Sequence, residues 1–255
     1  MDLKLSGKKV LITGGSRGIG LACGQLFAEE GCHVVLVGSN EDALGAAAQK
    51  LEAYGSAIEC VRADLSRNAG VESLSAQLQL ADIVVNNAGA IPGGGLDSVN
   101  DDVWRAAWDL KVFGYINATR AALPSMMERG HGVIVNVIGI AGANPKYDYI
   151  CGSVANSALI TFTKAAGAQA AKKGVRIVGV NPGPTETDRL IRLFKSRAAE
   201  KFGDESRWQE MLTDLPFGRA TKPEEIADLV VFLASARASY MSGVVIDADG
   251  GAMYA

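Results

Sequence analysis

A glycine-rich segment near the N-terminus has the residue types and the spacing of a phosphate-binding turn. It reads Thr13-Gly14-Gly15-Ser16-Arg17-Gly18-Ile19-Gly20, directly after an apolar run and directly before a helical pattern. Glycines at 14, 18 and 20 allow a tight turn and a close approach of the backbone to a ligand, and the start of the helix can hold a pyrophosphate. Its place between a first strand and a helix favours a dinucleotide site over a merely tight turn.

One lysine lies on an otherwise apolar stripe of a long helical pattern. Lys111 shares this stripe with Trp104, Trp108 and Tyr115, which recur at helical spacing. Burial disfavours the charged form of an ammonium group, so we expect the pKa of Lys111 to be lowered. The residue is therefore a candidate general acid or a cation that activates a phenol. The alternative is a side chain that snorkels at a subunit interface.

Short β-branched runs alternate with longer helical patterns, and these elements must position the residues above. We expect strands at 10–13, 34–37, 58–62, 83–86, 133–137, 176–180 and 244–247, and helices at 19–30, 40–54, 71–80, 101–129, 153–173 and 223–234. Several strands are apolar on consecutive residues, as in a parallel sheet covered on both faces. The alternation predicts one α/β domain over residues 1–255, with a doubly wound sheet and helices on both faces.

Residues 188–215 interrupt the alternation of strands and helices. They contain no strand, and their apolar residues fit two short helices. An inserted helical pair after a late strand is expected over the carboxyl edge of the sheet, where such folds bind ligands, so the segment is a candidate substrate lid. It carries an excess of basic residues, Arg189, Arg192, Lys195, Arg197 and Lys201, which either steer an anionic substrate or form a solvated face.

The amino-acid composition limits which classes of partner the protein is expected to bind. The 255 residues include 25 basic and 28 acidic ones, for a net charge of −3. This acidic balance argues against nucleic acid as the main partner. Four cysteines and two histidines show no zinc-ligand spacing, so we expect no metal site. A secretory leader and an apolar run of the ~20 residues that a membrane helix needs are both missing. We therefore expect a cytoplasmic protein with a small-molecule substrate and no membrane contact.

Motifs along the whole chain resemble the short-chain dehydrogenase/reductase family. They are T-G-x-x-x-G-x-G at 13–20, Asn86-Asn87-Ala88-Gly89, Asn181-Pro182-Gly183, and C-terminal motifs at 218–219, 223–227, 232–235 and 249–251. The resemblance covers residues 5–251 in the family's order and spacing. It implies a Rossmann fold with a seven-stranded sheet, a nicotinamide dinucleotide and a homo-oligomer, either a dimer or a tetramer.

The resemblance also implies which residues hold the cofactor. Asp64 is expected to contact the adenine, and residues 87–89 to line the adenine ribose and brace the central strands. Thr185 and Thr187 are expected near the nicotinamide carboxamide and the phosphates. The complete expected set is Gly14, Ser16, Arg17, Gly18, Ile19, Gly20, Ser39, Asn40, Asp64, Leu65, Asn87, Ala88, Gly89, Asn156, Pro182, Gly183, Thr185 and Thr187.

The end of the second strand bears on the choice of dinucleotide. NAD selection normally needs a carboxylate there, and Gly38 occupies the position. A 2′-phosphate then meets no like charge, and Arg17, Ser39 and Asn40 can bond it. The arginine that NADP-binding relatives often carry at the place of Ser39 is also missing. We expect NADP(H) to be favoured, with NAD(H) as the alternative.

The family's proton chemistry resembles acid–base catalysis by a tyrosine, a lysine four residues later, a serine, and an asparagine on the preceding long helix. Aligning the motifs puts Gly139 at the serine position and Gly152 at the tyrosine position. The same alignment puts Asn156 at the lysine position and Lys111 at the asparagine position. No other register restores the pattern, because no tyrosine of the chain has a lysine four residues later.

Two hypotheses follow. The first is an oxidoreductase with a non-standard active site, in which Lys111, Tyr149 and Asn156 are the candidate catalytic residues. Tyr149 lies three residues before the vacated tyrosine position, on the loop ahead of the helix, with Tyr147 as a second candidate. A loop or packing role is the alternative for Tyr149, whereas Asn156 can still bond the nicotinamide ribose. The second hypothesis is a catalytically inactive dinucleotide-binding sensor or assembly protein.

Overall fold

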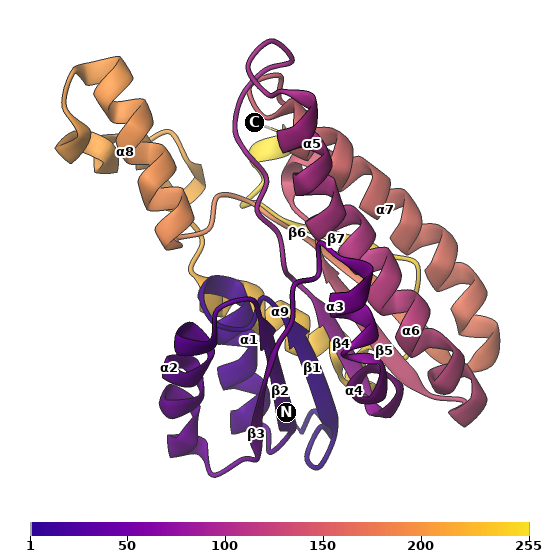
Figure 1. The fold of residues 1–255 in the computed structure, drawn as a ribbon. Coiled ribbons are helices and arrows are strands. Elements are labelled where there is room, and N and C mark those ends of the chain that lie inside the picture. Colours follow the sequence, from indigo (N-terminus) through magenta and orange to yellow (C-terminus); the bar gives the residue numbers. More distant parts are fainter. Residues whose placement is uncertain (1, 255) are drawn as a thin grey trace.

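The fold is built on a seven-stranded sheet, shown in Figure 1. The computed structural model describes residues 2–254, apart from the side chain of residue 196. The strands are β1 (Lys9–Thr13), β2 (His33–Gly38), β3 (Ile58–Arg62), β4 (Ile83–Asn86), β5 (Gly132–Val137), β6 (Val175–Pro182) and β7 (Val245–Ala248). All neighbouring strands pair in parallel, in the order β3-β2-β1-β4-β5-β6-β7. The predicted parallel sheet is confirmed.

Helices cover both faces of this sheet, as the alternation of patterns predicts. They are α1 (Gly18–Glu29), α2 (Glu41–Leu51), α3 (Asn68–Glu72), α4 (Ser75–Leu80), α5 (Asp101–Trp108), α6 (Gly114–Arg129), α7 (Ile150–Ala170), α8 (Asp188–Phe202) and α9 (Pro223–Ala234). Helices α1, α2 and α9 bury one face of the sheet, and α4, α6 and α7 bury the other. In the described residues, no helix is both long and apolar enough to cross a membrane.

The strand order reverses between β1 and β4. Successive strands run outward from β1 to β3 in one direction and from β4 to β7 in the other. The crossover helices leave the sheet on opposite sides at this point, which opens a crevice at the carboxyl ends of the strands. The glycine-rich turn follows β1, so it lies at this crevice.

The long helix expected at 101–129 contains a π-helical segment, η2 (Asp109–Phe113), between α5 and α6. A π-segment inserts an extra residue into the turn and shifts the faces of the helix that follows it; such segments are frequent at functional sites. Lys111 lies at the centre of this segment and is buried. The local irregularity therefore coincides with the lysine that the sequence marks out.

Three other helical regions differ in detail from the sequence expectation. The single helix expected at 71–80 is divided into α3, which ends at Glu72, and α4, which begins at Ser75. Helix α7 begins at Ile150 rather than near residue 153, so Tyr149 is its N-cap residue. The segment expected to hold two short helices forms α8 and a 3₁₀-helix, η5 (Glu205–Leu212). In Figure 1 this pair, in orange, projects from the body of the protein beyond the sheet.

Candidate active site

The glycine-rich turn adopts a conformation that side chains would prevent. Gly14 and Gly18 have positive φ angles of 65° and 54°, which favour glycine. A Cβ atom at Gly20 would overlap the carbonyl oxygen of Gly14. Arg17, the N-cap residue of α1, makes no side-chain hydrogen bond to the first turn of that helix. The N–H groups of this turn therefore have no side-chain cap, and the site fits a pyrophosphate.

Asn87 fastens the end of β4 to this turn. Its Nδ2 donates to the carbonyl oxygens of Thr13 and Gly14, each at 3.1 Å. The backbone N–H groups of Asn87 and Ala88 donate to Thr13 Oγ1 at 2.9 and 3.1 Å. The expected bracing of the central strands by this segment is confirmed, whereas its contact with the adenine ribose stays a prediction.

The segment after β6, which contains Thr185 and Thr187, packs against the glycine-rich turn. A Cβ atom at Gly18 would lie 3.2 Å from Thr187 Cγ2, although the two residues are far apart in the chain. The Thr187 hydroxyl caps α8 by accepting from the N–H of Leu190 at 3.4 Å. Thr185 is buried, and its hydroxyl donates to the carbonyl oxygen of Gly183 at 3.0 Å. Two segments of the expected cofactor site thus meet.

Two of the residues expected to bind the adenosine part of the cofactor, Asp64 and Asn40, are exposed, whereas Leu65 is buried. Asp64 accepts hydrogen bonds from Ser66 Oγ at 2.7 Å and from its N–H at 3.1 Å, and these contacts lower the pKa of the Asp64 carboxyl. Asn40 caps α2 through its side-chain oxygen, which accepts from the N–H of Ala43 at 2.8 Å, so its NH₂ group faces away from the cap. The expected cofactor residues lie at or just beyond the carboxyl ends of β1, β2, β3, β4 and β6, and Asn156 lies on α7.

Lys111 points into the protein. The residue is 8% exposed, and Nζ donates to the carbonyl oxygen of Ile138, just beyond β5, at 2.6 Å. Burial, followed by the positive charge of Arg189, lowers the pKa of Lys111 to about 7. The expected burial and lowered pKa are confirmed. Because the ammonium group bonds inward, it does not snorkel towards an interface.

Tyr149 fills the space beside Gly152. A Cβ atom at Gly152 would overlap the ring of Tyr149, so glycine is required for this ring position. The phenol oxygen accepts a hydrogen bond from Arg189 Nη2 at 3.1 Å. The backbone of Tyr149 is held by a parallel β-bridge to Gly94. The tyrosine is therefore fixed from both its main chain and its hydroxyl.

The side-chain oxygen of Asn156 is buried and accepts no hydrogen bond from the residues that the structure describes. The residue is 2% exposed, and in the part of the chain that the structure describes its Oδ1 has no partner. Its Nδ2 lies 2.8 Å from the position of a Cβ atom at Gly139, so the amide occupies the room that a side chain there would need. A buried acceptor without a donor is costly, so Asn156 Oδ1 is free to accept a hydrogen bond from a water molecule or a ligand.

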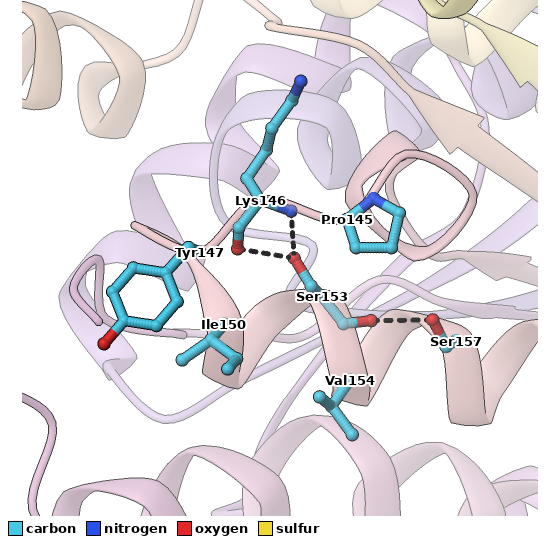
Figure 2. A pocket seen from close by; sticks show the side chains of 7 residues that line it. All are labelled: Pro145, Lys146, Tyr147, Ile150, Ser153, Val154 and Ser157. Carbon is cyan, nitrogen blue, oxygen red and sulfur yellow. Dashed lines mark hydrogen bonds between the residues drawn. The ribbon is translucent and has the colours of Figure 1, made fainter. Parts of the chain in front are cut away.

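Tyr147, the second tyrosine candidate, lies elsewhere. It is exposed, and Figure 2 shows it at the rim of a surface pocket. This pocket is lined by Pro145, Lys146, Tyr147, Ile150, Ser153, Val154 and Ser157. Neither Lys111 nor Asn156 lines this pocket. A part for Tyr147 in the candidate site therefore has no support in these contacts, whereas Tyr149 contacts Arg189 and lies beside Gly152.

Sequence reasoning missed one residue of the site. The sequence shows Arg189 only as one of the basic residues of segment 188–215, yet it contacts Tyr149, 40 positions earlier in the chain. Helical periodicity shows which residues share a face of one helix, but it carries no information about a contact between two separate segments. The excess of positive charge in segment 188–215 is the one signal in the sequence that points to Arg189.

The parallel sheet with its glycine turn defines a dinucleotide-binding α/β protein. Residues 8–198 match the family described as short chain dehydrogenase. The chain therefore belongs to the short-chain dehydrogenase/reductase family of NAD(P)-dependent oxidoreductases.

Relatives of known name match over nearly their full lengths. The chain is 33% identical to the 3-oxoacyl-(acyl-carrier-protein) reductase FabG of Chlamydia muridarum, covering 98% of this chain and 99% of that protein. It is 31% identical to the 2,3-dihydro-2,3-dihydroxybenzoate dehydrogenase of Bacillus subtilis, covering 97% of each. The structure of L-sorbose reductase from Gluconobacter frateurii, complexed with NADPH and L-sorbose, superposes with a TM-score of 0.93 at 33% identity over 100% of both chains.

Proposed function

We propose that the protein interconverts a carbonyl and an alcohol in a small molecule, with NADP(H) as its cofactor and with Tyr149 as the residue that exchanges the proton. The observation that carries this proposal is the ring of Tyr149 in the room left by Gly152. Gly152 stands where the resemblance places the family's tyrosine. A phenol from the preceding turn thus occupies space beside that position.

The residues present fit a nicotinamide dinucleotide. The glycine turn and the start of α1 would hold its pyrophosphate, and the orphaned Asn156 Oδ1 would accept a hydrogen bond from a ribose hydroxyl. When bound, the cofactor supplies or accepts a hydride. Tyr149 would give a proton to the substrate oxygen during reduction and take it back during oxidation.

Lys111 is the second proton-exchanging group in this proposal. In the alignment with the family, Lys111 stands at the position of the family's asparagine, and Asn156 stands at the position of the family's lysine. With a pKa of about 7, Lys111 takes up and releases a proton close to neutral pH. In its protonated form it also supplies the positive charge that favours a phenolate.

Tyr149→Phe tests the proton role. We expect kcat to fall by about 100-fold or more, the lower end of what a general acid contributes, with the NADPH affinity unchanged. Tyr147→Phe is the matched control, because it removes the hydroxyl of a nearby tyrosine outside the site. NADPH consumption is followed with 2,3-butanedione, L-sorbose and acetoacetyl-coenzyme A. An undiminished kcat in Tyr149→Phe would contradict the assignment.

The same assay tests the alternative hypothesis, in which the protein binds a dinucleotide but catalyses no reaction and acts as a sensor or an assembly protein. That alternative is favoured if none of the three carbonyl compounds is reduced while NADPH still binds with micromolar affinity. Dinucleotide binding should then change the oligomeric state or the protease sensitivity of the protein. Turnover of any of the three compounds above the rate without enzyme would contradict it.

The preference for NADP(H) is supported by the end of β2. A Cβ atom at Gly38 would lie 3.4 Å from Leu44 Cδ2, which is an ordinary contact, so a side chain fits there. Gly38→Asp would add the missing carboxylate, repelling a 2′-phosphate and accepting from a 2′-hydroxyl. We expect the ratio of NADPH to NADH affinity to fall by at least about tenfold. An unchanged ratio in a fluorescence titration would contradict the proposed cofactor site.

The proposal also includes a cytoplasmic homo-oligomer. Apolar side chains of Val103, Phe113 and Val154 remain exposed on α5, η2 and α7, and an interface between copies would cover such residues. Four free cysteines fit a reducing compartment. Light scattering after size-exclusion chromatography measures the mass, and a monomer at micromolar concentration would contradict the oligomer.

A further inference from the structure

Arg189 holds the phenol oxygen of Tyr149 while it is itself anchored. Its Nη2 lies 3.1 Å from Tyr149 Oη and 2.6 Å from the carbonyl oxygen of Ile91. This nitrogen carries two hydrogens, so it can make both contacts at once. The guanidinium carbon lies 5.8 Å from the centre of the tyrosine ring. The contact to Ile91 therefore fixes the arginine in a position from which it reaches the hydroxyl.

In the hydrogen bond between Arg189 and Tyr149, the phenol oxygen accepts, so the phenol proton is available for a second hydrogen bond. Arginine has donors and no acceptor, so Tyr149 Oη must accept. Among the described residues, none accepts a hydrogen bond from Tyr149 Oη. The O–H group can then point to another molecule, and a substrate oxygen is such an acceptor.

The beginning of α8 connects this contact with the glycine turn. Arg189 stands two residues after Thr187, whose methyl group lies against Gly18. One turn of chain therefore touches both the expected pyrophosphate site and the phenol. Further along α8, Arg197 pairs with Asp148 at 2.8 Å, which ties the helix to the residue next to Tyr149.

We propose that Arg189 is a positioning residue for proton transfer by Tyr149: it holds the phenol oxygen, directs the phenol proton towards the substrate and balances the charge of the phenolate that forms. This inference rests on the proposed function, in which Tyr149 exchanges the proton. The beginning of α8 then takes part in the chemistry, beyond covering the site or steering a substrate.

In the direction of reduction, the proton of Tyr149 completes the conversion of the carbonyl group to an alcohol. The carbonyl carbon accepts a hydride from the reduced nicotinamide dinucleotide, and the electron pair of the C=O π bond moves to the oxygen. That oxygen takes the proton as the O–H bond of Tyr149 breaks. The phenolate keeps the hydrogen bond from Arg189, now charge-assisted, and the guanidinium offsets its negative charge. Oxidation of the alcohol reverses each of these movements.

The first test requires no turnover. The six tyrosines are replaced biosynthetically by 3-fluorotyrosine, and the ¹⁹F resonance of residue 149 is identified as the one that Tyr149→Phe removes. We expect Arg189→Met to shift this resonance. Arg192→Met is the matched control, because it removes the same charge from an exposed position on the same helix. A resonance that moves equally in both variants, or in neither, would overturn the inference.

The second test is a double-mutant cycle on turnover. Arg189→Met should lower kcat by about 10- to 100-fold in the natural protein, with KM and the NADPH dissociation constant within about threefold. Arg189→Lys should recover part of the loss, because it keeps a charged donor. In the Tyr149→Phe background, Arg189→Met should change kcat by less than about threefold.

These experiments separate failure of the inference from failure of the proposed function. An equal loss of kcat on Arg189→Met with and without the Tyr149 hydroxyl overturns the positioning role and leaves the proton role of Tyr149 intact. A full kcat in Tyr149→Phe overturns the proposed function, and this inference with it. Arg197→Met checks for a simple docking effect of α8, since it breaks the ion pair to Asp148 and spares the phenol contact. A loss as large as that of Arg189→Met would overturn the inference.

Discussion

Replacing Lys111 by methionine should change how the stability of the folded protein depends on pH. Lys111 is 8% exposed, and burial together with the charge of Arg189 lowers the pKa of its ammonium group from 10.5 to about 7. Between these two values the unfolded chain binds a proton that the folded protein does not. The contribution of Lys111 to the free energy of unfolding therefore rises with pH across this window. Below about pH 7 the penalty of the buried charge is fully present.

The magnitude follows from the size of the pKa change. One pH unit corresponds to about 1.4 kcal/mol, so a pKa lowered from 10.5 to about 7 corresponds to a penalty of about 5 kcal/mol at low pH. The difference in unfolding free energy, natural protein minus Lys111→Met, should rise by about 2.5 kcal/mol between pH 7.5 and 9.5. Between pH 5.5 and 7.5 it should rise by less than about 1 kcal/mol. Loss of the hydrogen bond to Ile138 adds a constant that cancels in these differences.

Urea unfolding of the dinucleotide-free protein, followed by circular dichroism, measures this difference. Protomer concentration is held fixed, because an oligomer makes the apparent stability depend on it. Lys50→Met, which removes an exposed lysine near the end of α2, controls for the loss of one positive charge. A difference that stays constant from pH 5.5 to 9.5 would refute the argument, since Lys111 would then carry the same charge in both states.

Three further substitutions have outcomes that the structure predicts. Gly20→Ala should abolish NADPH binding in a fluorescence titration, because its Cβ atom would overlap the carbonyl oxygen of Gly14. Gly45→Ala should raise the unfolding free energy by about 0.5–1 kcal/mol and spare NADPH binding, since it lies within α2 and a Cβ atom there meets open space. Arg176→Met should cost about 2–4 kcal/mol in urea unfolding, because its guanidinium donates to four carbonyl oxygens at and beyond the end of α9, those of Leu233, Ala234, Ser235 and Met241.

For each of these three substitutions, one result would contradict the prediction. NADPH affinity within a few-fold of the natural value in Gly20→Ala would show that the turn tolerates a side chain. A loss of stability in Gly45→Ala would show that this surface of α2 is covered, for example by another copy of the chain. A change below about 0.5 kcal/mol in Arg176→Met would show that water replaces the guanidinium at these carbonyls.

Local patterns in the sequence were sufficient for the elements of the fold. All seven expected strands form, and helix α9 begins at Pro223 and ends at Ala234 as expected from its proline and acidic first turn. The glycine-rich turn is equally local, because the glycines at 14, 18 and 20, at the end of a strand and the start of a helix, allow a backbone conformation that side chains would prevent. Burial of Lys111 also followed from periodicity alone. Each of these features depends on neighbours within a few turns of chain.

The arrangement of the candidate site depends on contacts between distant segments. Lys111 reaches Ile138, Thr187 lies against Gly18, and Arg189 reaches Tyr149 across 40 positions. Periodicity places a residue on a face of its own element, but the partner of that face depends on the packing of the whole sheet and its helices. The sequence by itself thus determined the class of fold and the place of the dinucleotide turn. Only the tertiary structure decided that the Tyr149 ring fills the space beside Gly152 and that Arg189 of α8 donates to its hydroxyl. Both contacts depend on packing between segments of the chain that no local pattern relates.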